Sequence, residues 1–282
     1  MRLIGNMQGR LVSPEGGLIQ FFPRKRWDAE FALAAQAGFT LLEWLYDVWG
    51  EDDNPIVEDD GIRAMAALSS QHGVSVRSLC AHYFVERPFV KSRGDDLARL
   101  VRKLEWLLAR CRPAGIRHVV VPFLDSGAIR TDAEERCALD VLRGVLPVAN
   151  QNGVAVHLEC SLAPAAYARF LEKLAAPEIR ITYDTGNSAS FGYPVAEELA
   201  AYGASIGSVH IKDRILGGGS VPLGTGDANL PARLRALLTM GYAGDFILEA
   251  ARGTPGGELA WAKRNLSVVS HLLAGSAVSV PQ

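Results

Sequence analysis

Cysteine is scarce in this chain of 282 residues, which has four thiols at Cys80, Cys111, Cys137 and Cys160 and no CxxC pair. We therefore expect free thiols in a reducing compartment rather than a disulfide framework. Long apolar runs are also missing, since none approaches the ~20 residues that a membrane-spanning helix needs. The first residues contain no cationic segment followed by an apolar run, so we expect no signal peptide and a cytoplasmic location.

An excess of positive charge is absent as well. Lys and Arg total 29 against 31 Asp and Glu, and no basic stripe is found in the sequence. Binding to nucleic acid depends on such a concentration of positive charge, so we expect no nucleic-acid partner. Hydrophobic residues at 49% and charged residues at 21% are typical of a globular protein.

Short apolar runs alternate with longer helical patterns along the whole sequence. We predict strands at 3–8, 39–46, 74–82, 118–123, 154–160, 179–185, 206–212 and 246–250. We predict helices at 27–37, 58–72, 95–112, 132–152, 163–174, 195–202, 230–240 and 258–273. Eight strand–helix units with no element left over predict an α/β protein, one (β/α)8 TIM barrel domain over residues 1–282, with a loose tail after about residue 273.

Four consecutive predicted strands end in side chains suited to metal binding: Glu159, Asp184, His210 and Glu249. Active sites of such barrels lie at the carboxyl ends of the strands. Strand alternation supports a common inward direction, because Val209 and Ile211 share the face opposite to His210. Three carboxylates and an imidazole would repel one another unless a cation lay between them. We therefore predict one divalent ion, Mn²⁺, Mg²⁺, Co²⁺ or Zn²⁺, without a choice among them.

The same segments resemble the xylose-isomerase-like TIM barrel superfamily of sugar isomerases and epimerases, which also contains endonuclease IV. The resemblance covers nearly the whole chain. It is carried by HLE at 157–159, YDTGN at 183–187, VHIKD at 209–213, PLGTGD at 222–227, LE at 248–249 and NMQGRL at 6–11. It implies a metal-dependent isomerase acting on a sugar or sugar phosphate, similar to the ketose 3-epimerases.

In ketose 3-epimerases the positions that match Glu159, Asp184, His210 and Glu249 hold one metal ion, and the two glutamates form the acid–base pair. The resemblance therefore implies that one glutamate removes the proton from the carbon next to a carbonyl, and the other returns a proton to the opposite face. Their closeness to each other and to the cation should shift their pKa values in opposing directions.

Four further residues are expected to contact the substrate: Glu43, His82, Asn187 and Arg214. For Glu43 the alternative is a structural ion pair, and for His82 it is loop packing. Asn187 departs from the ketose 3-epimerases, which usually have histidine there, and an amide cannot carry a proton. We expect Lys212 on the barrel exterior or behind the ligands, although it could meet a phosphate. The glycines at 217–219 and 224–226 suggest a lid, or backbone amides that cradle a phosphate.

Other functions remain open at this stage. An inosose-type dehydratase would use the same metal and proton abstraction and then lose water. An endonuclease IV-like nuclease requires three metals and more histidines, yet Asn187 occupies one such position and the strand at 118–123 ends without a ligand. A non-catalytic sugar binder would not need the complete ligand set. The sequence leaves open the sugar, its phosphorylation and the oligomeric state, although relatives often form a homodimer or homotetramer.

Overall fold

Eight parallel strands close into a barrel in the computed structural model, which describes residues 3–275. The strands are β1 (Ile4–Met7), β2 (Leu41–Leu45), β3 (Ser75–Cys80), β4 (His118–Phe123), β5 (Ala155–Cys160), β6 (Arg180–Asp184), β7 (Ile206–Ile211) and β8 (Phe246–Leu248). Each strand pairs with the next in sequence, and β8 pairs with β1. The predicted TIM barrel is therefore confirmed.

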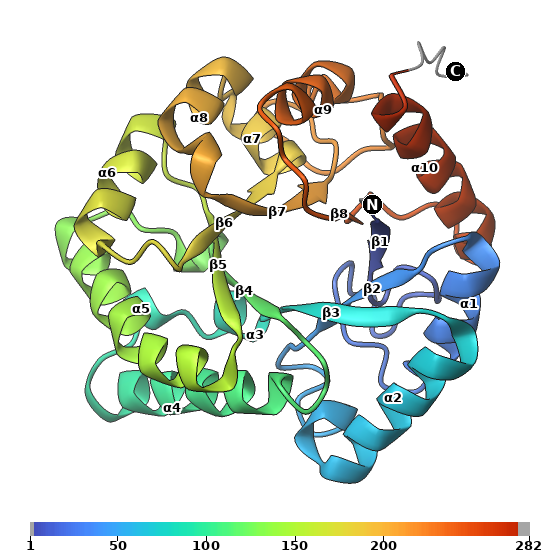
Figure 1. The fold of residues 1–282 in the computed structure, drawn as a ribbon, viewed down its shortest axis with the longest axis horizontal. Helices are drawn as coiled ribbons and strands as arrows, with labels where there is room; N and C mark the ends of the chain where they lie inside the picture. Colours follow the sequence, from blue (N-terminus) through green and yellow to red (C-terminus); the bar gives the residue numbers. More distant parts are fainter. Residues whose placement is uncertain (1–2, 276–282) are drawn as a thin grey trace.

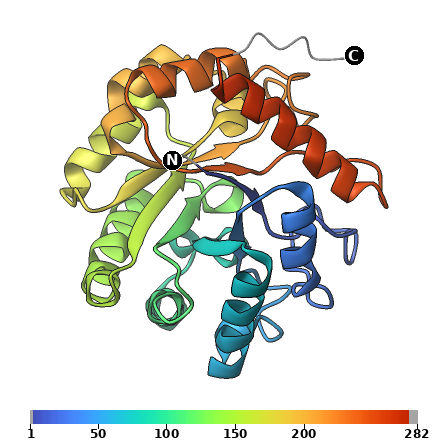
Figure 2. The ribbon, with the colours of Figure 1, turned by 45° about the vertical axis from the view of Figure 1, so that its right-hand side comes forward.

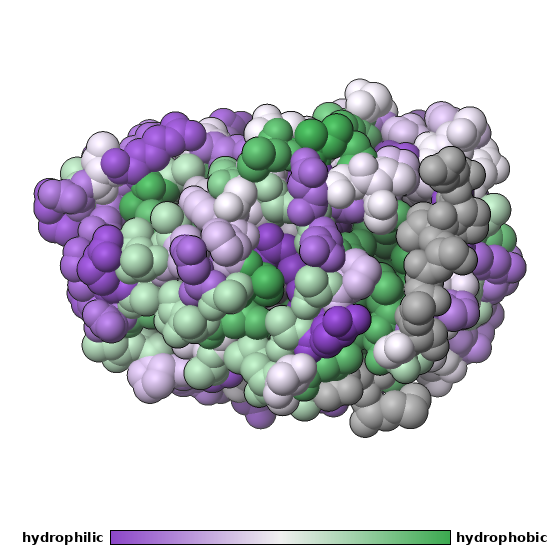
Figure 3. Space-filling model, turned by 90° about the horizontal axis from the view of Figure 1, so that it is seen from above, coloured by the Kyte–Doolittle hydropathy of each residue, from purple (hydrophilic) through white to green (hydrophobic). Residues whose placement is uncertain are grey.

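Helices surround the strand ring on its outer side (Figures 1 and 2). They are α1 (Ala29–Ala37), α2 (Asp59–His72), α3 (Tyr83–Glu86), α4 (Gly94–Cys111), α5 (Asp132–Asn152), α6 (Pro164–Leu174), α7 (Thr185–Phe191), α8 (Val195–Tyr202), α9 (Leu230–Thr239) and α10 (Glu258–Leu273). Single 3₁₀ turns lie at Pro55–Val57, Phe89–Lys91, Asp125–Gly127 and Gly203–Ser205. On the side of α8 and α9, hydrophilic and hydrophobic residues are intermixed over the surface (Figure 3).

Local sequence signals set several helix ends where we predicted them. Thr131 and Glu134 form a capping box at the start of α5, in which each side chain accepts a hydrogen bond from the other's backbone amide. Gly153 ends this helix with a φ of 63°, a left-handed conformation that suits a residue without Cβ. Gly38 and Gly73 end α1 and α2 in the same way.

The two faces of the barrel strands differ in polarity. Val119, Val121 and Leu158 are buried in the apolar layer between strands and helices. Inside the barrel, His157 Nδ1 lies 2.8 Å from Ser208 Oγ. Polar side chains can therefore point inward without entering the apolar layer. The inward positions at the strand ends can accordingly hold the charged side chains of an active site.

Two helices were not predicted, α3 and α7. The prediction that strand six continues to Thr185 is wrong, because α7 begins there. Asp184 caps this helix: its Oδ1 accepts hydrogen bonds from the backbone amides of Gly186 and Asn187, both at 2.8 Å. Asn187 consequently lies in the first turn of a helix rather than at a strand end.

Within residues 3–275, no helix combines the length and apolar character that a membrane crossing requires. The loose tail expected after residue 273 falls mostly on residues 276–282, which lie outside the described residues.

Candidate metal centre and active site

The four predicted ligands converge at the carboxyl end of the barrel. Glu159 lies on β5, Asp184 ends β6, His210 lies on β7 and Glu249 directly follows β8. One ligand atom from each lies within 4.8 Å of the corresponding atoms of the others. We call these four residues the ligand cluster. Because successive parallel strands end at the same face, residues distant in sequence are brought together here.

Asp184 has its two carboxylate oxygens in different environments. Oδ1 is engaged by the two backbone amides at the start of α7. Oδ2 is buried and accepts no hydrogen bond from the described residues, and it faces the ammonium of Lys212 at 3.0 Å. Oδ2 is therefore the oxygen that Asp184 can offer to a cation.

His210 is fully buried between two carboxylates. Its Nε2 lies 2.7 Å from Glu43 Oε1, and its Nδ1 lies 3.1 Å from Glu249 Oε2 and 4.0 Å from Glu159 Oε2. Burial alone would lower the pKa of His210, but Glu43 and Glu249 raise it well above its ordinary value. The distances show that Nδ1 is the nitrogen that faces the ligand cluster, whereas Nε2 faces Glu43.

Glu43 lies behind His210. Its side chain is fully buried, and among the described residues it is not part of the wall of the cavity above the ligand cluster. This geometry favours the ion-pair alternative for Glu43 over direct substrate contact. Such a carboxylate holds the imidazole ring in place from the side opposite to the ligand cluster.

Lys212 lies inside the barrel and contacts two of the ligands, so the barrel-exterior alternative is wrong and the alternative of a residue that supports the ligands agrees with the structure. Its Nζ lies 2.6 Å from Glu249 Oε1 and 3.0 Å from Asp184 Oδ2. Burial alone would lower its pKa, but these carboxylates raise it above the ordinary value of a lysine. Residues two apart on a strand point to the same side, so the inward direction of His210 already indicated that of Lys212.

The pKa values of the two glutamates of the ligand cluster are shifted in opposite directions by burial and by the charges around them. Burial, followed by the charges of neighbouring carboxylates, raises the pKa of Glu159 to about 8. Burial would also raise the pKa of Glu249, but Lys212 and His210 hold it well below its usual range. A divalent ion between the two glutamates would favour the ionised form of both.

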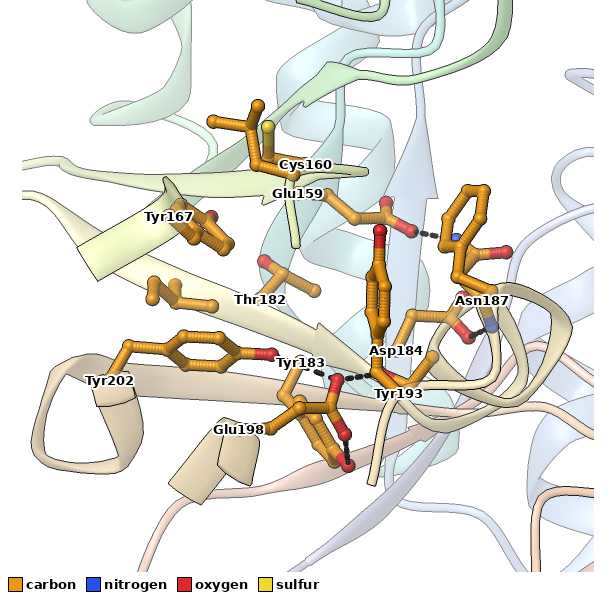
Figure 4. Close-up of a pocket in the computed structure, with 14 residues that line it drawn as sticks. Glu159, Cys160, Tyr167, Thr182, Tyr183, Asp184, Asn187, Tyr193, Glu198 and Tyr202 are labelled. Carbon is orange, nitrogen blue, oxygen red and sulfur yellow. Dashed lines mark hydrogen bonds between the residues drawn. The ribbon is translucent and has the colours of Figure 1, made fainter. Parts of the chain in front are cut away.

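Asn187 and Arg214 are connected to Glu159 by a chain of hydrogen bonds. Asn187 Nδ2 donates to Glu159 Oε1 at 2.7 Å (Figure 4). Arg214 Nη1 donates to Asn187 Oδ1 at 2.8 Å, while its Nε and Nη2 donate to the carbonyl of Gly218. Arg214 thereby fixes the Asn187 amide with its NH₂ group toward the glutamate.

A cavity of about 220 Å³ lies above the ligand cluster, and we call it the mouth cavity. Its walls include three of the predicted substrate-binding residues, namely His82, Asn187 and Arg214. Burial lowers the pKa of His82, which favours its neutral form. The cavity is smaller than the roughly 300–1,000 Å³ of pockets for drug-sized ligands, and this suits a small sugar.

Arg10 is a further cation in the wall of the mouth cavity, and it was not among the predicted site residues. Its Nη2 lies 3.8 Å from Glu249 Oε1, and its Nη1 donates to the carbonyl of Ile19 at 3.0 Å. Arg10 follows β1 at the face of the barrel where functional loops lie, which is the sequence signal that could have indicated it.

The glycine-containing loop after β7 is folded against Asp213. Asp213 Oδ2 accepts hydrogen bonds from the amides of Gly224 at 2.8 Å and Gly226 at 3.0 Å, and Arg214 pairs with Ser220 in an antiparallel bridge. A phosphate cradle was one of the two alternatives for these amides. They are already engaged by a carboxylate, so this arrangement does not support a phosphate site on them.

A second buried acidic group lies beside the ligand cluster, and sequence reasoning did not identify it. Tyr183 and Tyr202 donate hydrogen bonds to the Glu198 carboxylate at 2.8 and 2.9 Å (Figure 4). Ser188 and Arg233 also donate to it, and Arg233 forms the ion pair. We call these five residues the Glu198 cluster. It joins β6, α7, α8 and α9.

Residues 31–269 match the family model of the xylose isomerase-like TIM barrel. The chain belongs to this family. It is 27% identical to L-ribulose-5-phosphate 3-epimerase UlaE of Salmonella heidelberg (strain SL476) over 242 residues. This match covers 79% of this chain and 81% of the relative. The solved structure of an L-ribulose 3-epimerase matches with a TM-score of 0.78 and 21% identity over 100% of both chains.

A structure of the IOLI protein with a bound zinc atom matches with a TM-score of 0.74 and 17% identity, covering 99% of this chain and 100% of that one. The expected family is thus confirmed, and the two epimerases support the expectation of an isomerase-class enzyme. None of these three relatives is described as a dehydratase, so the comparisons do not favour that alternative.

Proposed function

We propose that the protein is a divalent-metal-dependent epimerase that inverts C3 of a ketose or ketose phosphate. The observation that carries this proposal is the ligand cluster, four side chains with ligand atoms within 4.8 Å, two of which, Glu159 and Glu249, line a cavity of about 220 Å³. The similarity to 3-epimerases of L-ribulose and its 5-phosphate supports both the reaction class and the substrate class.

The residues of the ligand cluster fit a divalent ion. Three carboxylates and one imidazole supply hard oxygen donors with a single nitrogen, and Asp184 Oδ2 and His210 Nδ1 both face the centre of the cluster. Glu159, Asp184, His210 and Glu249 would hold the ion. When bound, it would polarise the sugar carbonyl and offset the negative charge that develops on oxygen as the proton leaves carbon.

The protein itself supplies the proton transfers. Glu159 and Glu249 belong to different sides of the mouth, with β6 and β7 between their strands. One carboxylate takes the proton from C3, and the other delivers a proton to the opposite face of that carbon. Asn187 holds Glu159 in place through its Nδ2, so the carboxyl is positioned before the substrate arrives.

The mouth cavity would orient the rest of the sugar. His82, Asn187 and Arg214 from the predicted set line it, together with Arg10. Polar side chains of this kind recognise hydroxyl groups, and guanidinium groups also suit a phosphate. Glu43 acts behind His210 and would not touch the sugar.

Hydrogen exchange at carbon tests this proposal. The protein is stripped of metal, reloaded separately with Mn²⁺, Mg²⁺, Co²⁺ or Zn²⁺, and incubated in D₂O with a panel of ketoses and ketose phosphates. We expect ¹H NMR to show deuterium at C3 together with a new epimer in at least one combination. The Glu159→Gln variant, assayed with the same metal, is the matched control and should give no new epimer, because only one face of C3 then meets a carboxyl group that can transfer a proton.

Two other results of the same experiment would contradict the proposed epimerase activity. Metal-loaded protein that exchanges no proton on any ketose would contradict the proposed epimerase. Loss of water from a cyclic polyol ketone in parallel samples would identify a dehydratase instead.

A further inference from the structure

The ammonium of Lys212 contacts two carboxylates of the ligand cluster, and at Asp184 it contacts the oxygen that a metal ion would use. Its Nζ lies 3.0 Å from Asp184 Oδ2 and 2.6 Å from Glu249 Oε1. Asp184 has no alternative oxygen to offer, because its Oδ1 already accepts two backbone hydrogen bonds from α7. Both cations therefore require Asp184 Oδ2.

We propose that Lys212 is a built-in competitor of the divalent ion. Its ammonium balances the carboxylates of the ligand cluster, and binding of the ion displaces it from Asp184 and Glu249 toward the mouth cavity, which Lys212 already lines. This inference rests on the metal site of the proposed function, and it adds a specific role for a residue that is not a ligand.

Electrostatics explains why the two cations would not share these oxygens. A divalent ion and an ammonium held a few ångströms apart repel each other, and the repulsion is stronger in a buried site than in water. Without either cation, the buried carboxylates of the cluster would repel one another instead. Lys212 should therefore stabilise the protein that holds no ion and weaken its affinity for the ion.

Packing restricts the displacement to the end of the side chain. The Lys212 stem lies against Gly186, so close that a Cβ built on the glycine would lie 2.7 Å from Lys212 Cγ and 2.8 Å from Lys212 Cβ. The backbone amide of Lys212 donates to Thr185 Oγ1 at 3.0 Å, and Thr185 Oγ1 donates to its carbonyl at 2.7 Å. With the backbone and stem fixed, rotation of the outer bonds moves only the ammonium.

Replacement of Lys212 by Met tests the competition, because Met keeps the apolar stem and removes the charge. Mn²⁺ affinity is measured by calorimetry, and thermal unfolding is followed in EDTA and in saturating Mn²⁺. We expect Lys212→Met to bind Mn²⁺ about tenfold more tightly or better, because the repelling charge is gone. We also expect the variant to melt below the wild type in EDTA but close to it in Mn²⁺.

Lys103→Met is the matched control. Lys103 is another partly buried lysine with a carboxylate partner, since its Nζ lies 2.7 Å from Glu51 Oε1. Its loss should lower the melting temperature equally in EDTA and in Mn²⁺ and leave Mn²⁺ affinity unchanged. This pattern separates competition at the ligand cluster from the general loss of a buried ion pair.

A measurement on the wild type keeps the inference testable if Lys212→Met does not fold. Amine-specific labelling of Lys212, read by mass spectrometry, should increase when Mn²⁺ is added, whereas labelling of Lys103 should not. Unchanged labelling of Lys212, or unchanged or weaker Mn²⁺ affinity of Lys212→Met, would overturn the inference while the metal site stands. Failure of the wild type to bind Mn²⁺, Mg²⁺, Co²⁺ or Zn²⁺ would overturn the metal site and this inference together.

Discussion

The ligand cluster and the Glu198 cluster are both buried and acidic, yet they differ in how their oxygens are satisfied. The Glu198 carboxylate receives hydrogen bonds at both oxygens, including two tyrosine hydroxyls and the Arg233 guanidinium. The ligand cluster crowds three carboxylates around His210, and Asp184 Oδ2 accepts no hydrogen bond from the described residues. A carboxylate whose oxygens all accept hydrogen bonds stabilises the fold, whereas carboxylates held by a single ammonium at the edge of a cavity can exchange that partner for a bound cation.

Neighbouring residues of one strand supply the two clusters. Tyr183 and Asp184 are adjacent on β6, and alternation sends their side chains to opposite faces of the sheet. Figure 4 shows Glu159 directed toward Asn187, while Glu198 lies among Tyr183 and Tyr202. The same strand thus contributes Tyr183 to a hydrogen-bonded network on its outer face and Asp184 to the ligand cluster on its inner face.

Glu159→Gln should have the largest effect on activity, and it should change the unfolding of the metal-free protein little. We expect kcat to fall by roughly 10²–10⁴-fold, because the amide cannot transfer a proton. Unfolding should change little, since Gln retains the side-chain oxygen that can accept from Asn187 Nδ2. Kinetics on the identified sugar and thermal unfolding check both parts. An active Gln variant would remove Glu159 from the acid–base pair.

Glu198→Gln should have the reverse pattern. Removing one partner of a buried ion pair leaves Arg233 uncompensated and costs about 3–5 kcal/mol in the free energy of unfolding. Affinity of the folded protein for the metal should be unchanged. Denaturant unfolding and calorimetry measure the two quantities. Tyr202→Phe, which removes one hydrogen bond to Glu198, is a milder variant expected to cost about 1 kcal/mol.

Metal binding should stabilise the protein through the ligand cluster. At a free metal concentration 100 times the Kd, the free energy of unfolding should rise by about 2.7 kcal/mol. Tyr202→Phe should keep this increment, whereas His210→Ala should lose most of it. Unfolding with and without chelator measures the increment, and an equal increment in His210→Ala would contradict the assignment of His210 as a ligand.

A third buried acid, Glu30, should make the stability of the protein depend on pH. Burial raises the pKa of Glu30 to about 7 from an ordinary 4.5. The folded state therefore holds this proton more tightly than the unfolded state, so the contribution is present below pH 4.5 and is lost as pH rises through about 7. Its slope is at most about 1.4 kcal/mol per pH unit.

The variant Glu30→Gln isolates this contribution, because Gln does not titrate. The difference in the free energy of unfolding between wild type and variant should decline from pH 4.5 to about 7. A difference that stays constant over this range would show that Glu30 is ionised in the folded protein throughout. The carboxylate accepts amide hydrogen bonds from Gly9 and Leu11, which hold the loop carrying Arg10.

Periodicity and capping residues were enough to predict the alternation of strands and helices, because these signals act within a few residues of each other. The bounds of β4, α5, α8 and α10 agree with the prediction. The ends of four successive strands also indicated the ligand cluster, since parallel strands in a barrel end at one face. These features depend on local pattern and on a topology that the pattern already implies.

Tertiary structure alone decided which partner each polar side chain meets. Substrate contact and a structural ion pair were both open for Glu43, and the closed barrel places it against His210. Lys212 turned out to contact two ligands, and the Glu198 cluster joined four separate elements. Such contacts link residues far apart in sequence, and their distances depend on how helices pack on the barrel. The sequence by itself determined at which strand ends carboxylates lie close together. Only the packing of the folded chain decided which of these carboxylates accept hydrogen bonds from other residues at both oxygens.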